Sequence, residues 1–434
     1  MIQPMGLCSL KAAAKEALPG KVQVKVLDAG GLETGEVAAE VFRYEPEVVG
    51  ITTFTEARHK ALAVARATKN IFPDALTLLG GVHATHTATQ ILDNYPFVDV
   101  VLIGEGEKNF VDFLISPETV KGIVYRGREG IKTRKDPGMI KDLDTLPFPD
   151  YSDLDLSKYI ETEGPGKGQP LMAIETSRGC PYNCSFCSSR SVWGNIRYKS
   201  VKRVLDEIDY WFDRGYRYFS FIDDIFTIDT NRTIEICRGL INRSTYVTWK
   251  CQTRTDRVDD RVLNLMNLAG CRLIAFGVES GSPTVLDAIN KKETPDDIKM
   301  AFELCRQHKI ESVFNIIVGS PGETKDTLKE TRNLIKECNP THIATAALRA
   351  YPGSGIWNLG IEKGLFTEDI LLTNQESIHY EGSLSINQMY RELIKFRILQ
   401  AQLRGWRGWV ELIRMGLRTV KETPMKLVRG VVGR

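Results

Sequence analysis

Short apolar runs alternate with amphipathic stretches through the first 140 residues. Runs with strand character cover residues 22–28, 48–53, 75–81 and 98–103, and a helical pattern covers residues 57–71. This alternation is typical of an α/β domain built on a doubly wound parallel sheet. Glycines and small hydroxyl residues follow the strands, so the backbone at their carboxyl ends can approach a large ligand.

The same alternation returns about six times after residue 170. The expected strands are 171–176, 216–222, 247–251, 273–278, 312–318 and 342–348, and the expected helices are 201–212, 233–241, 260–268, 295–308 and 323–336. Six units are too few to close a standard eight-stranded barrel. Chemistry in strand-and-helix barrels sits at the carboxyl ends of the strands, so those ends are the places to search.

Proline and glycine interrupt the pattern between the two regions. The segment 141–169 contains Leu-Pro-Phe-Pro-Asp at 146–150 and Gly-Pro-Gly-Lys-Gly at 164–168, which are strong helix and strand breakers. We expect a linker here. Its glycine-rich part is interpreted as a loose loop, with a mobile flap as the alternative.

A basic helical pattern closes the chain. Apolar residues recur every three or four positions from Tyr390 to Val420, and residues 391–434 hold eleven Lys or Arg and three Asp or Glu. A basic amphipathic helix can lie on an anionic membrane. The favoured alternative is a helix that caps the open barrel and leaves its basic face in water.

Composition narrows the class of protein. With 434 residues and 42% hydrophobic residues, the chain is long enough for two or three domains with sizeable cores. Nine cysteines without a secretory leader predict a cytoplasmic location. No stretch reaches the ~18 apolar residues of a membrane span, and the mildly acidic main body carries no nucleic-acid footprint.

Three cysteines form the most specific pattern. Cys180, Cys184 and Cys187 stand in a Cys-x3-Cys-x2-Cys array on a loop opened by Gly179 and Pro181. Their soft sulfur ligands suit an iron–sulfur cluster or zinc. A structural zinc site needs four protein ligands, whereas three cysteines on a four-iron cluster leave one iron open to a small molecule.

With Phe186 before the last cysteine, this loop resembles the signature of the radical SAM superfamily. In that family the open iron of a [4Fe-4S] cluster chelates S-adenosyl-L-methionine (SAM), and electron transfer cleaves SAM to a 5′-deoxyadenosyl radical. The six strand and helix units match the open (β/α)6 partial barrel of these proteins. The resemblance also implies an electron donor such as flavodoxin or ferredoxin.

Strand ends of the second region resemble SAM-binding segments of the same family. The carboxylates Asp223 and Asp224 match the ammonium-binding site, with a helix N-cap as the alternative. Arg254 matches a carboxylate or substrate anchor, with an ordinary surface arginine as the alternative. The remaining SAM residues implied by the resemblance are Phe186, Glu279, Ser280, Gly281, Val318 and Gly319.

The N-terminal region resembles the cobalamin-binding domain found ahead of many radical SAM cores. The resemblance rests on Leu-Gly-Gly-Val-His-Ala-Thr at 79–85 and Gly-Glu-Gly-Glu at 104–107, with a generic nucleotide fold as the alternative. It implies cobalamin contacts by Thr52, Thr53, Gly80, Gly81, Val82, His83, Thr85, Gly104, Glu105 and Gly106. The Asp-x-His-x2-Gly element of other B12 proteins is absent, because Ala29 follows Asp28. We expect His83 and His86 to be hydrogen-bonding residues rather than cobalt ligands.

Together these patterns predict an α/β protein with a Rossmann-like cobalamin-binding domain (1–140), a linker (141–169), a radical SAM core (170–365) and a helical basic C-terminal region (366–434). The resemblance implies a methyltransferase acting at an unactivated carbon through the 5′-deoxyadenosyl radical and methylcobalamin.

The alternatives are a cobalamin-containing cyclase, rearrangement or oxidation enzyme, and a cobalamin-independent dehydratase or dehydrogenase with a vestigial first domain. If the protein is not an enzyme, the alternative is a cofactor- or metal-binding regulator. The expected substrate is a small molecule, a pigment or a lipid-like compound. Contact of the C-terminal helix with a membrane surface is the remaining option.

Overall fold

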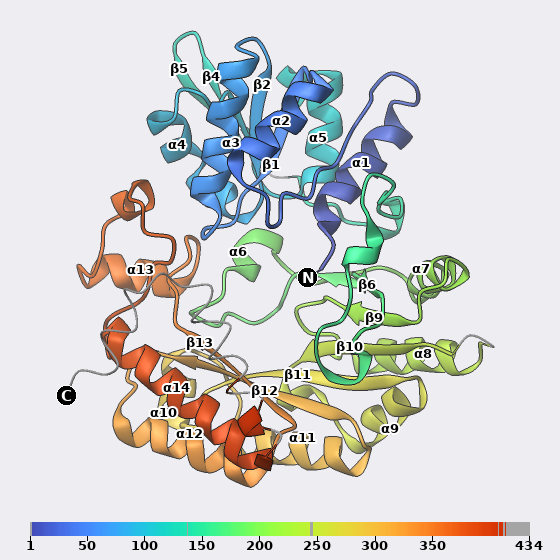
Figure 1. The fold of residues 1–434 in the computed structure, drawn as a ribbon, viewed down its shortest axis with the longest axis vertical. Coiled ribbons are helices and arrows are strands. Elements are labelled where there is room, and N and C mark those ends of the chain that lie inside the picture. The colour runs from blue at the N-terminus through green and yellow to red at the C-terminus, as the bar shows by residue number, and fades with distance from the viewer. Residues whose placement is uncertain (1, 137, 244–245, 407, 411–412, 414–434) are drawn as a thin grey trace.

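Two sheet-based domains lie one above the other in the computed structural model, which describes residues 2–136, 138–243, 246–406, 408–410 and 413 (Figure 1). Strands β1 (Val48–Thr52), β2 (Leu76–Gly80) and β3 (Val100–Leu102) of the N-terminal domain pair in parallel. The hairpin of β4 (Gly122–Gly127) and β5 (Gly130–Lys135) adds two antiparallel strands, giving the order β1-β2-β3-β4-β5. The parallel part of the sheet is therefore as expected.

Five helices among the described residues accompany this sheet: α1 (Met5–Ala17), α2 (Thr34–Tyr44), α3 (Arg58–Ile71), α4 (Val82–Asn94) and α5 (Gly106–Ile115). Apolar side chains of the central strands pack on both faces of the sheet, with Leu79 and Val101 on one face and Leu78 and Val100 on the other. Strands buried on both sides explain the continuous apolar runs in the sequence.

The expected strand at 22–28 is wrong. This segment pairs with no strand, and the backbone N–H of Val26 donates instead to the carboxylate of Asp153 in the linker, at 2.7 Å. An apolar run becomes a strand only where a neighbouring strand satisfies its backbone. The run serves as an extended connection between α1 and α2.

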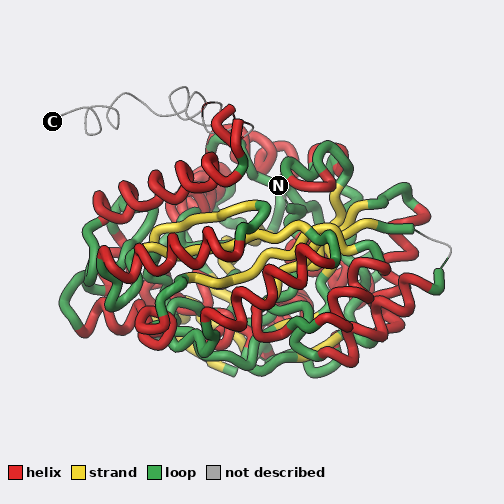
Figure 2. The backbone as a smooth tube through the Cα atoms, turned by 90° about the horizontal axis from the view of Figure 1, so that it is seen from below, coloured by secondary structure: helices red, strands yellow, loops and turns green. Residues whose placement is uncertain are grey.

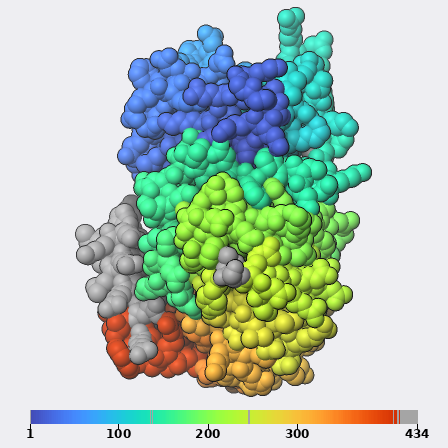
Figure 3. Space-filling model, turned by 90° about the vertical axis from the view of Figure 1, so that its right-hand side faces the viewer, coloured from blue at the N-terminus to red at the C-terminus, as the bar shows by residue number. Residues whose placement is uncertain are grey.

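The linker is ordered, and its glycine-rich part is not a loose loop. Short 3-10 turns occur at η2 (Leu143–Thr145), η3 (Leu156–Lys158) and η4 (Gly164–Gly166). A Cβ atom at Gly166 would lie 2.3 Å from the ring of Tyr218, so the glycine backbone rests directly on that ring. The linker also fills the side of the molecule between the two domains in Figure 3.

The second domain is an open barrel of six parallel strands in the order β13-β12-β11-β10-β9-β6. The strands are β6 (Leu171–Ile174), β9 (Tyr218–Phe221), β10 (Thr248–Thr253), β11 (Cys271–Glu279), β12 (Glu311–Val318) and β13 (His342–Ala347). All six match the expected runs to within a few residues, and Figure 2 shows helices lying outside them. The predicted partial barrel is confirmed.

The helices that follow the barrel strands also match expectation. They are α7 (Val201–Asp213), α8 (Thr230–Ile241), α9 (Asp260–Leu268), α10 (Pro283–Ala288), α11 (Pro295–Gln307) and α12 (Lys325–Cys338), and a further helix, α13 (Gly355–Glu362), follows β13. Side chains of α7 to α9 and α11 to α12 pack with the strands into one large core. The core leaves the loops at the strand ends free to hold ligands.

Other parts of the chain cover the two edges of the open barrel. At the β6 edge the side-chain amide of Gln3 donates to Leu171 O at 2.5 Å and accepts from Ala173 N at 3.3 Å, as a neighbouring strand would. At the opposite edge helix α14 (Ile386–Leu403) buries Met389 and Phe396 against the barrel core. The barrel-capping interpretation holds for this helix, and most of the predicted extension to Val420 lies outside the described residues.

Candidate active site

The cysteine loop hangs from a short ribbon after β6. The strands β7 (Ser177–Arg178) and β8 (Arg197–Tyr198) pair antiparallel, and the cysteines and helix α6 (Ser189–Trp193) lie between them. Gly179 begins the loop with φ +90°, and a Cβ atom there would lie 2.8 Å from Asn195 O. The loop therefore needs glycine for both its conformation and its close backbone approach.

The three loop cysteines differ from the other six. Cys187 is exposed and Cys180 and Cys184 are half-buried, whereas the remaining thiols are buried. Backbone N–H groups point at two of the loop sulfurs, from Tyr182 to Cys180 and from Ser189 to Cys187 at 3.4 Å. Such donors stabilise thiolates that bind iron.

Although Cys187 as a residue is exposed, the protein atoms around its sulfur exclude much of the water and raise the pKa of the thiol to about 11, so binding iron must displace its proton. Within the described residues no group of three His, Cys, Asp or Glu side chains is placed to hold a single metal ion. Cysteines that each bind a different iron of a cluster need not converge on one point.

Contacts from later parts of the barrel fix the loop on its far side. Ser185 donates its N–H to Ile289 O at 3.0 Å and accepts from the N–H of Ile356 at 2.7 Å. Phe186 packs against an apolar cluster that includes Leu348 and Trp357. The loop thus has a defined shape in the protein alone, and Phe186 lies within it as a half-buried side chain.

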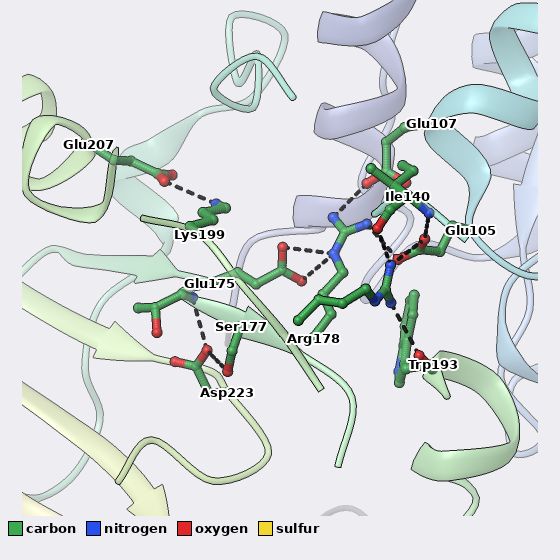
Figure 4. Close-up of polar contacts among 12 residues, drawn as sticks. Glu105, Glu107, Ile140, Glu175, Ser177, Arg178, Trp193, Lys199, Glu207 and Asp223 are labelled. Atoms are coloured by element: carbon green, nitrogen blue, oxygen red, sulfur yellow. Dashed lines mark hydrogen bonds and ion pairs between the residues drawn. The ribbon is translucent and has the colours of Figure 1, made fainter. Parts of the chain in front are cut away.

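The structure separates the two predicted ammonium-binding carboxylates. Asp223 is buried and points back to the ribbon, where Thr176 N donates to it at 2.9 Å and Ser177 Oγ at 2.6 Å (Figure 4). Burial raises its pKa to about 6. Asp224 is exposed, accepts from Ser189 Oγ, and its charge reaches Cys180 and Cys187. Asp223 therefore holds the loop, and Asp224 faces it.

A buried charge network lies at the end of β11. Glu279 has φ +69°, a conformation that glycine favours, next to a register shift in the strand. Its Oε1 lies 3.7 Å from Lys291 Nζ, which is also 3.4 Å from Glu293 Oε2. Burial opposes the charge of Lys291, but the two carboxylates outweigh it and raise its pKa. Backbone strain beside buried charges is typical of a functional site.

Other predicted SAM residues are engaged within the barrel. Arg254 stacks over the ring of Tyr182, 3.8 Å from its centroid, and donates twice to the Asp256 carboxylate, at 2.8 and 2.9 Å. Its guanidinium supports the cysteine loop, and a role as SAM anchor stays a prediction. Ser280 and Gly281 contact Thr331 of α12, so they hold the strand end.

The end of β12 carries a protonatable carboxylate. Val318 is fully buried, and Gly319, at φ +102°, donates its N–H to Glu323 Oε2 at 2.5 Å. Burial raises the pKa of Glu323 to about 7. A Cβ atom at Gly319 would collide with Met389 of α14, so this turn is closely packed.

The carboxyl edge of the N-terminal sheet forms a second cradle. Gly81 has φ +91°, and a Cβ atom there would lie 2.8 Å from Thr52 Oγ1 and 3.0 Å from the Thr53 backbone. The Thr53 hydroxyl is buried without a hydrogen-bond partner. Gly104 donates its N–H to Thr85 Oγ1 at 3.1 Å. A small pocket behind this edge is lined by Thr53, Arg58, Leu62, Leu79, His83 and Tyr95, among others.

The two histidines of this edge behave differently. His83 is buried, its Nδ1 shares a hydrogen bond of 3.1 Å with Thr55 Oγ1, and burial lowers its pKa to about 4. This is the hydrogen-bonding histidine that the sequence suggested. His86 instead reaches the barrel, where its Nε2 lies 3.3 Å from Ser191 Oγ and its ring packs on Gly353.

Comparisons with known proteins agree with this architecture. Residues 174–335 match the model of the radical SAM superfamily, and residues 1–114 match that of the B12 binding domain. An uncharacterized methyltransferase of Pyrococcus horikoshii is 31% identical over 83% of this chain and 79% of its own. The chain belongs to the radical SAM superfamily. It is a radical SAM enzyme with a B12-binding domain ahead of the core.

A second relative and one solved structure are similar to this chain over most of its length. An anaerobic magnesium-protoporphyrin IX monomethyl ester cyclase of Rubrivivax gelatinosus is 31% identical over 75% of this chain, which spans 60% of that protein. The structure of the radical SAM methyltransferase TsrM from Kitasatospora setae has a TM-score of 0.69 at 19% identity, over 82% of this chain and 73% of that one. The TsrM likeness establishes the shared fold.

The residues present fit the cofactors of a radical SAM enzyme. The loop offers three accessible sulfurs with backbone donors, which suits a [4Fe-4S] cluster with an open iron. In the B12-binding domain the partnerless Thr53 hydroxyl and the crowded Gly81 turn suit a large polar ligand at the sheet edge. The individual SAM and cobalamin contacts stay predictions.

Sequence reasoning missed the residues that join the domains. Arg58 of α3 is almost fully buried and donates to backbone carbonyls of the C-terminal region, among them Leu371 O at 2.9 Å and Glu376 O at 3.2 Å. Glu56 Oε1 accepts from Arg349 at 2.9 Å and from Tyr351 at 2.5 Å. These partners stand about 300 residues apart in the sequence, so no local pattern could pair them.

A second contact between the two domains is made by the stem of the cysteine loop. Arg178 and Arg197 of the radical SAM core meet Glu105 and Glu107 of the B12-binding domain in a buried cluster (Figure 4). Glu105 was predicted as a cobalamin contact, but its buried carboxylate is occupied by the two arginines. A cobalamin contact at this position would have to come from its backbone.

Proposed function

We propose that this enzyme is a cobalamin-dependent radical SAM methyltransferase that acts at an unactivated carbon of a small molecule. The observation that carries the proposal is that the carboxyl ends of both sheets face one another across a narrow joint, where His86 meets Ser191 and Glu56 meets Arg349. Ligands bind at such strand ends in both kinds of sheet. Two cofactors bound there would share one interface with the substrate.

When bound, the reduced cluster and SAM supply a 5′-deoxyadenosyl radical, and cobalamin supplies a transferable methyl group. The chain's own residues have three tasks. Cys180, Cys184 and Cys187 would hold the cluster through their three sulfurs. Asp224 offers an exposed carboxylate beside the loop, and Lys291 holds Glu279 and Glu293 at the end of β11. The Asp224 carboxylate suits the ammonium group of the amino acid part of SAM.

The N-terminal edge binds and orients by its backbone. The turns at Gly81 and Gly104 bring main-chain atoms to the ligand side of the sheet, where a side chain would block the approach. Arg58 holds this edge against residues 371–376.

A radical cyclase is the second candidate, favoured by the likeness to the Rubrivivax protein. The two functions leave different remains of SAM. Methyl transfer releases S-adenosylhomocysteine, whereas hydrogen abstraction alone releases 5′-deoxyadenosine. The test is anaerobic reconstitution followed by incubation with SAM, reductant and candidate substrate, with both nucleosides counted by mass spectrometry.

A methyltransferase forms both nucleosides together with a product that carries the methyl group of SAM, traced with a deuterated methyl. Deoxyadenosine with unmethylated product contradicts methyl transfer and supports the cyclase. Absence of deoxyadenosine from SAM under reductant contradicts radical chemistry altogether.

The proposal also includes a substrate class and an electron donor. Relatives by name include a hopanoid C-3 methylase and a bacteriochlorophyllide methyltransferase, which favours a lipid-like or pigment substrate here. A low-potential donor such as flavodoxin or ferredoxin would reach the cluster where Arg190 donates to Pro181 O and Arg257 to the Tyr182 hydroxyl. Their positive charges complement an acidic redox protein.

Membrane contact is also proposed for the segment after α14. None of the described helices is long and apolar enough to cross a bilayer. Trp406, Trp409 and Ile413 nevertheless expose large apolar surface in a basic stretch, which suits binding at a lipid surface. Most of the residues that would complete this segment lie outside the part of the chain described.

A further inference from the structure

The cysteine loop has a stem made of four residues. In the ribbon, Ser177 pairs with Tyr198 and Arg178 pairs with Arg197. All residues from 179 to 196, the three cysteines among them, are carried by this stem. Directly opposed residues of an antiparallel pair lie on the same face. The two arginines are therefore set side by side.

Both arginines end on one carboxylate of the other domain. Arg178 Nη1 lies 3.2 Å from Glu105 Oε1, and Arg197 Nη1 lies 2.8 Å from Glu105 Oε2 (Figure 4). The same Oε2 accepts from the N–H of Ile140 at 2.5 Å, and Ile140 O accepts from Arg197. Glu105 thus ties together the start of α5, the end of the N-terminal region at Ile140 and both strands of the stem.

Further carboxylates fix Arg178 in direction. Its Nη2 donates to Glu107 Oε1 at 2.6 Å, and its Nε lies 2.9 Å from Glu175 Oε2. The side chain of Glu105 has no exposed surface, and that of Arg178 has 8%. Burying such charges is costly, and it adds little stability that apolar packing would not give. What charge-assisted bonds of defined geometry add is orientation.

The barrel holds the other end of the stem. Asp223 binds Thr176 N and Ser177 Oγ, and Arg232 donates to both Thr176 O and Lys199 O at 2.9 Å. These contacts fix the base of the stem on the barrel, and Ser185 and Phe186 fix the far side of the loop there as well. On the opposite face the two arginines meet Glu105, and this contact ties the stem to the B12-binding domain.

Glu105 itself belongs to the ligand edge of the B12-binding domain. It directly follows Gly104, whose backbone N–H is held by Thr85, and it stands just before α5. Glu105 therefore connects the edge predicted to bind cobalamin with the stem of the loop predicted to bind the cluster.

We propose that Glu105 is a positioning residue that sets where the cysteine loop stands relative to the B12-binding domain. The distance from the cluster to cobalt, and with it the efficiency of methyl transfer, then depends on this carboxylate. The kinetic part of this inference rests on the proposed function, whereas the structural part does not.

The test compares Glu105→Gln with two other variants in the full chain. Glu40→Gln is the control, because Glu40 makes an ion pair with Lys25 on the surface of the same domain. Arg197→Lys is the second variant, because lysine keeps the charge but cannot bind Glu105 and Ile140 O with one planar group. Pulsed EPR of the reduced holoenzyme measures the distance between the cluster and Co(II) cobalamin.

We expect a narrow distance distribution in the native enzyme and in Glu40→Gln, and a broadened or shifted one in Glu105→Gln and Arg197→Lys. Deoxyadenosine formation should stay close to native while methylated product falls on the order of 10- to 100-fold, because misplacement of reacting groups is costly. An unchanged distance distribution in both Glu105→Gln and Arg197→Lys would overturn the proposal.

Hydrogen exchange of the cofactor-free protein separates this proposal from the proposed function. Amides of residues 176–199 should exchange faster in Glu105→Gln than in Glu40→Gln, whether or not cobalamin binds. Equal exchange in the two variants contradicts the positioning role. If Glu105→Gln does not fold, Arg197→Lys gives the decision by the same measurements.

Discussion

The radical SAM core and the B12-binding domain hold their candidate ligand residues in different ways. At the strand ends of the core, Asp223, Glu279 and Glu323 are buried and bonded to neighbours within the same domain. At the edge of the B12-binding domain, Arg58, His86 and Glu105 find their partners outside that domain. The core site is thus built locally, and the other edge is completed by docking.

This difference indicates how variants in the two regions should differ in their effects. A locally built site keeps its geometry when the other domain moves, because its partners move with it. An edge completed by docking depends on the contact itself. Variants in the core should therefore abolish ligand binding or stability outright, and variants at the joint should mainly change how the two sites are arranged.

The largest effect is expected from Cys184→Ala in the radical SAM core. One of three cluster ligands is lost, so we expect no stable cluster, measured as iron content and as absorbance of the reconstituted protein. The control is Cys237→Ala, which removes a buried thiol of α8 and should leave the iron content unchanged. Native iron content in Cys184→Ala would contradict the assignment.

Lys291→Met tests the buried charges of the core. It leaves Glu279 and Glu293 without their cation, and removing one partner of a buried ion pair costs about 3–5 kcal/mol of unfolding free energy. The adjacent Lys292→Met is the matched control, because Lys292 and its partner Asp287 are largely exposed and such pairs contribute under about 1 kcal/mol. Chemical denaturation measures both. Equal losses would show that Lys291 is not a buried partner.

Arg58→Met tests the docked half. Its guanidinium donates to carbonyls of Thr55 and of residues 371–376, so we expect a loss of about 3 kcal/mol at most and earlier proteolytic cleavage after residue 365. Arg66→Met is the control, since Arg66 is an exposed residue of the same helix stacked over Phe97. A proteolysis pattern like that of the control would show that Arg58 does not hold residues 371–376 in place.

Glu323 makes the stability of the radical SAM core depend on pH. Burial raises its pKa from 4.5 to about 7, so between these values the folded chain holds a proton that the unfolded chain has lost. Its contribution to stability is therefore largest at low pH and is lost as the pH rises through this window.

Glu323→Gln removes this titration and keeps an oxygen for the Gly319 N–H. Relative to the native protein, the variant should gain about 2 kcal/mol on going from pH 5 to pH 8, measured by urea unfolding at both values. Glu330→Gln, an exposed change on α12, the helix that follows Glu323, should show no such gain. A pH-independent difference for Glu323→Gln would contradict the raised pKa.

The smallest effect is expected from removing residues 404–434. Helix α14 stays, so the barrel edge remains covered and the melting temperature should change little. Co-sedimentation with anionic vesicles should fall, because the exposed Trp406 and Trp409 and most of the terminal basic residues are lost. Equal pelleting of the two forms would reject the membrane contact.

The sequence predicted the core better than the joint, for a physical reason. Buried parallel strands read as apolar runs, and the cysteine spacing is local, so both are visible along the chain. The run at 22–28 has the same composition as a strand but no neighbour to pair with. Asp223 and Asp224 could not be told apart, because their environments differ only once the ribbon is in place.

The missed residues are those whose partners lie far away in the sequence. Lys291 gained its meaning from Glu279, and Arg58 from carbonyls beyond residue 370. Arg178 offered one usable signal, since a charged residue two positions before the first cysteine stands on the stem of the loop. Its acidic partners in the other domain, Glu105 and Glu107, stand about 70 residues earlier and gave no sign of the pairing.

The central claim is that one chain binds both the iron–sulfur cluster and cobalamin. Cofactor content after anaerobic reconstitution and gel filtration tests this claim most directly. The account predicts about four iron atoms per chain together with roughly stoichiometric cobalamin that co-elutes with the protein. Cobalamin that elutes entirely with the small molecules, or iron near zero, would contradict it.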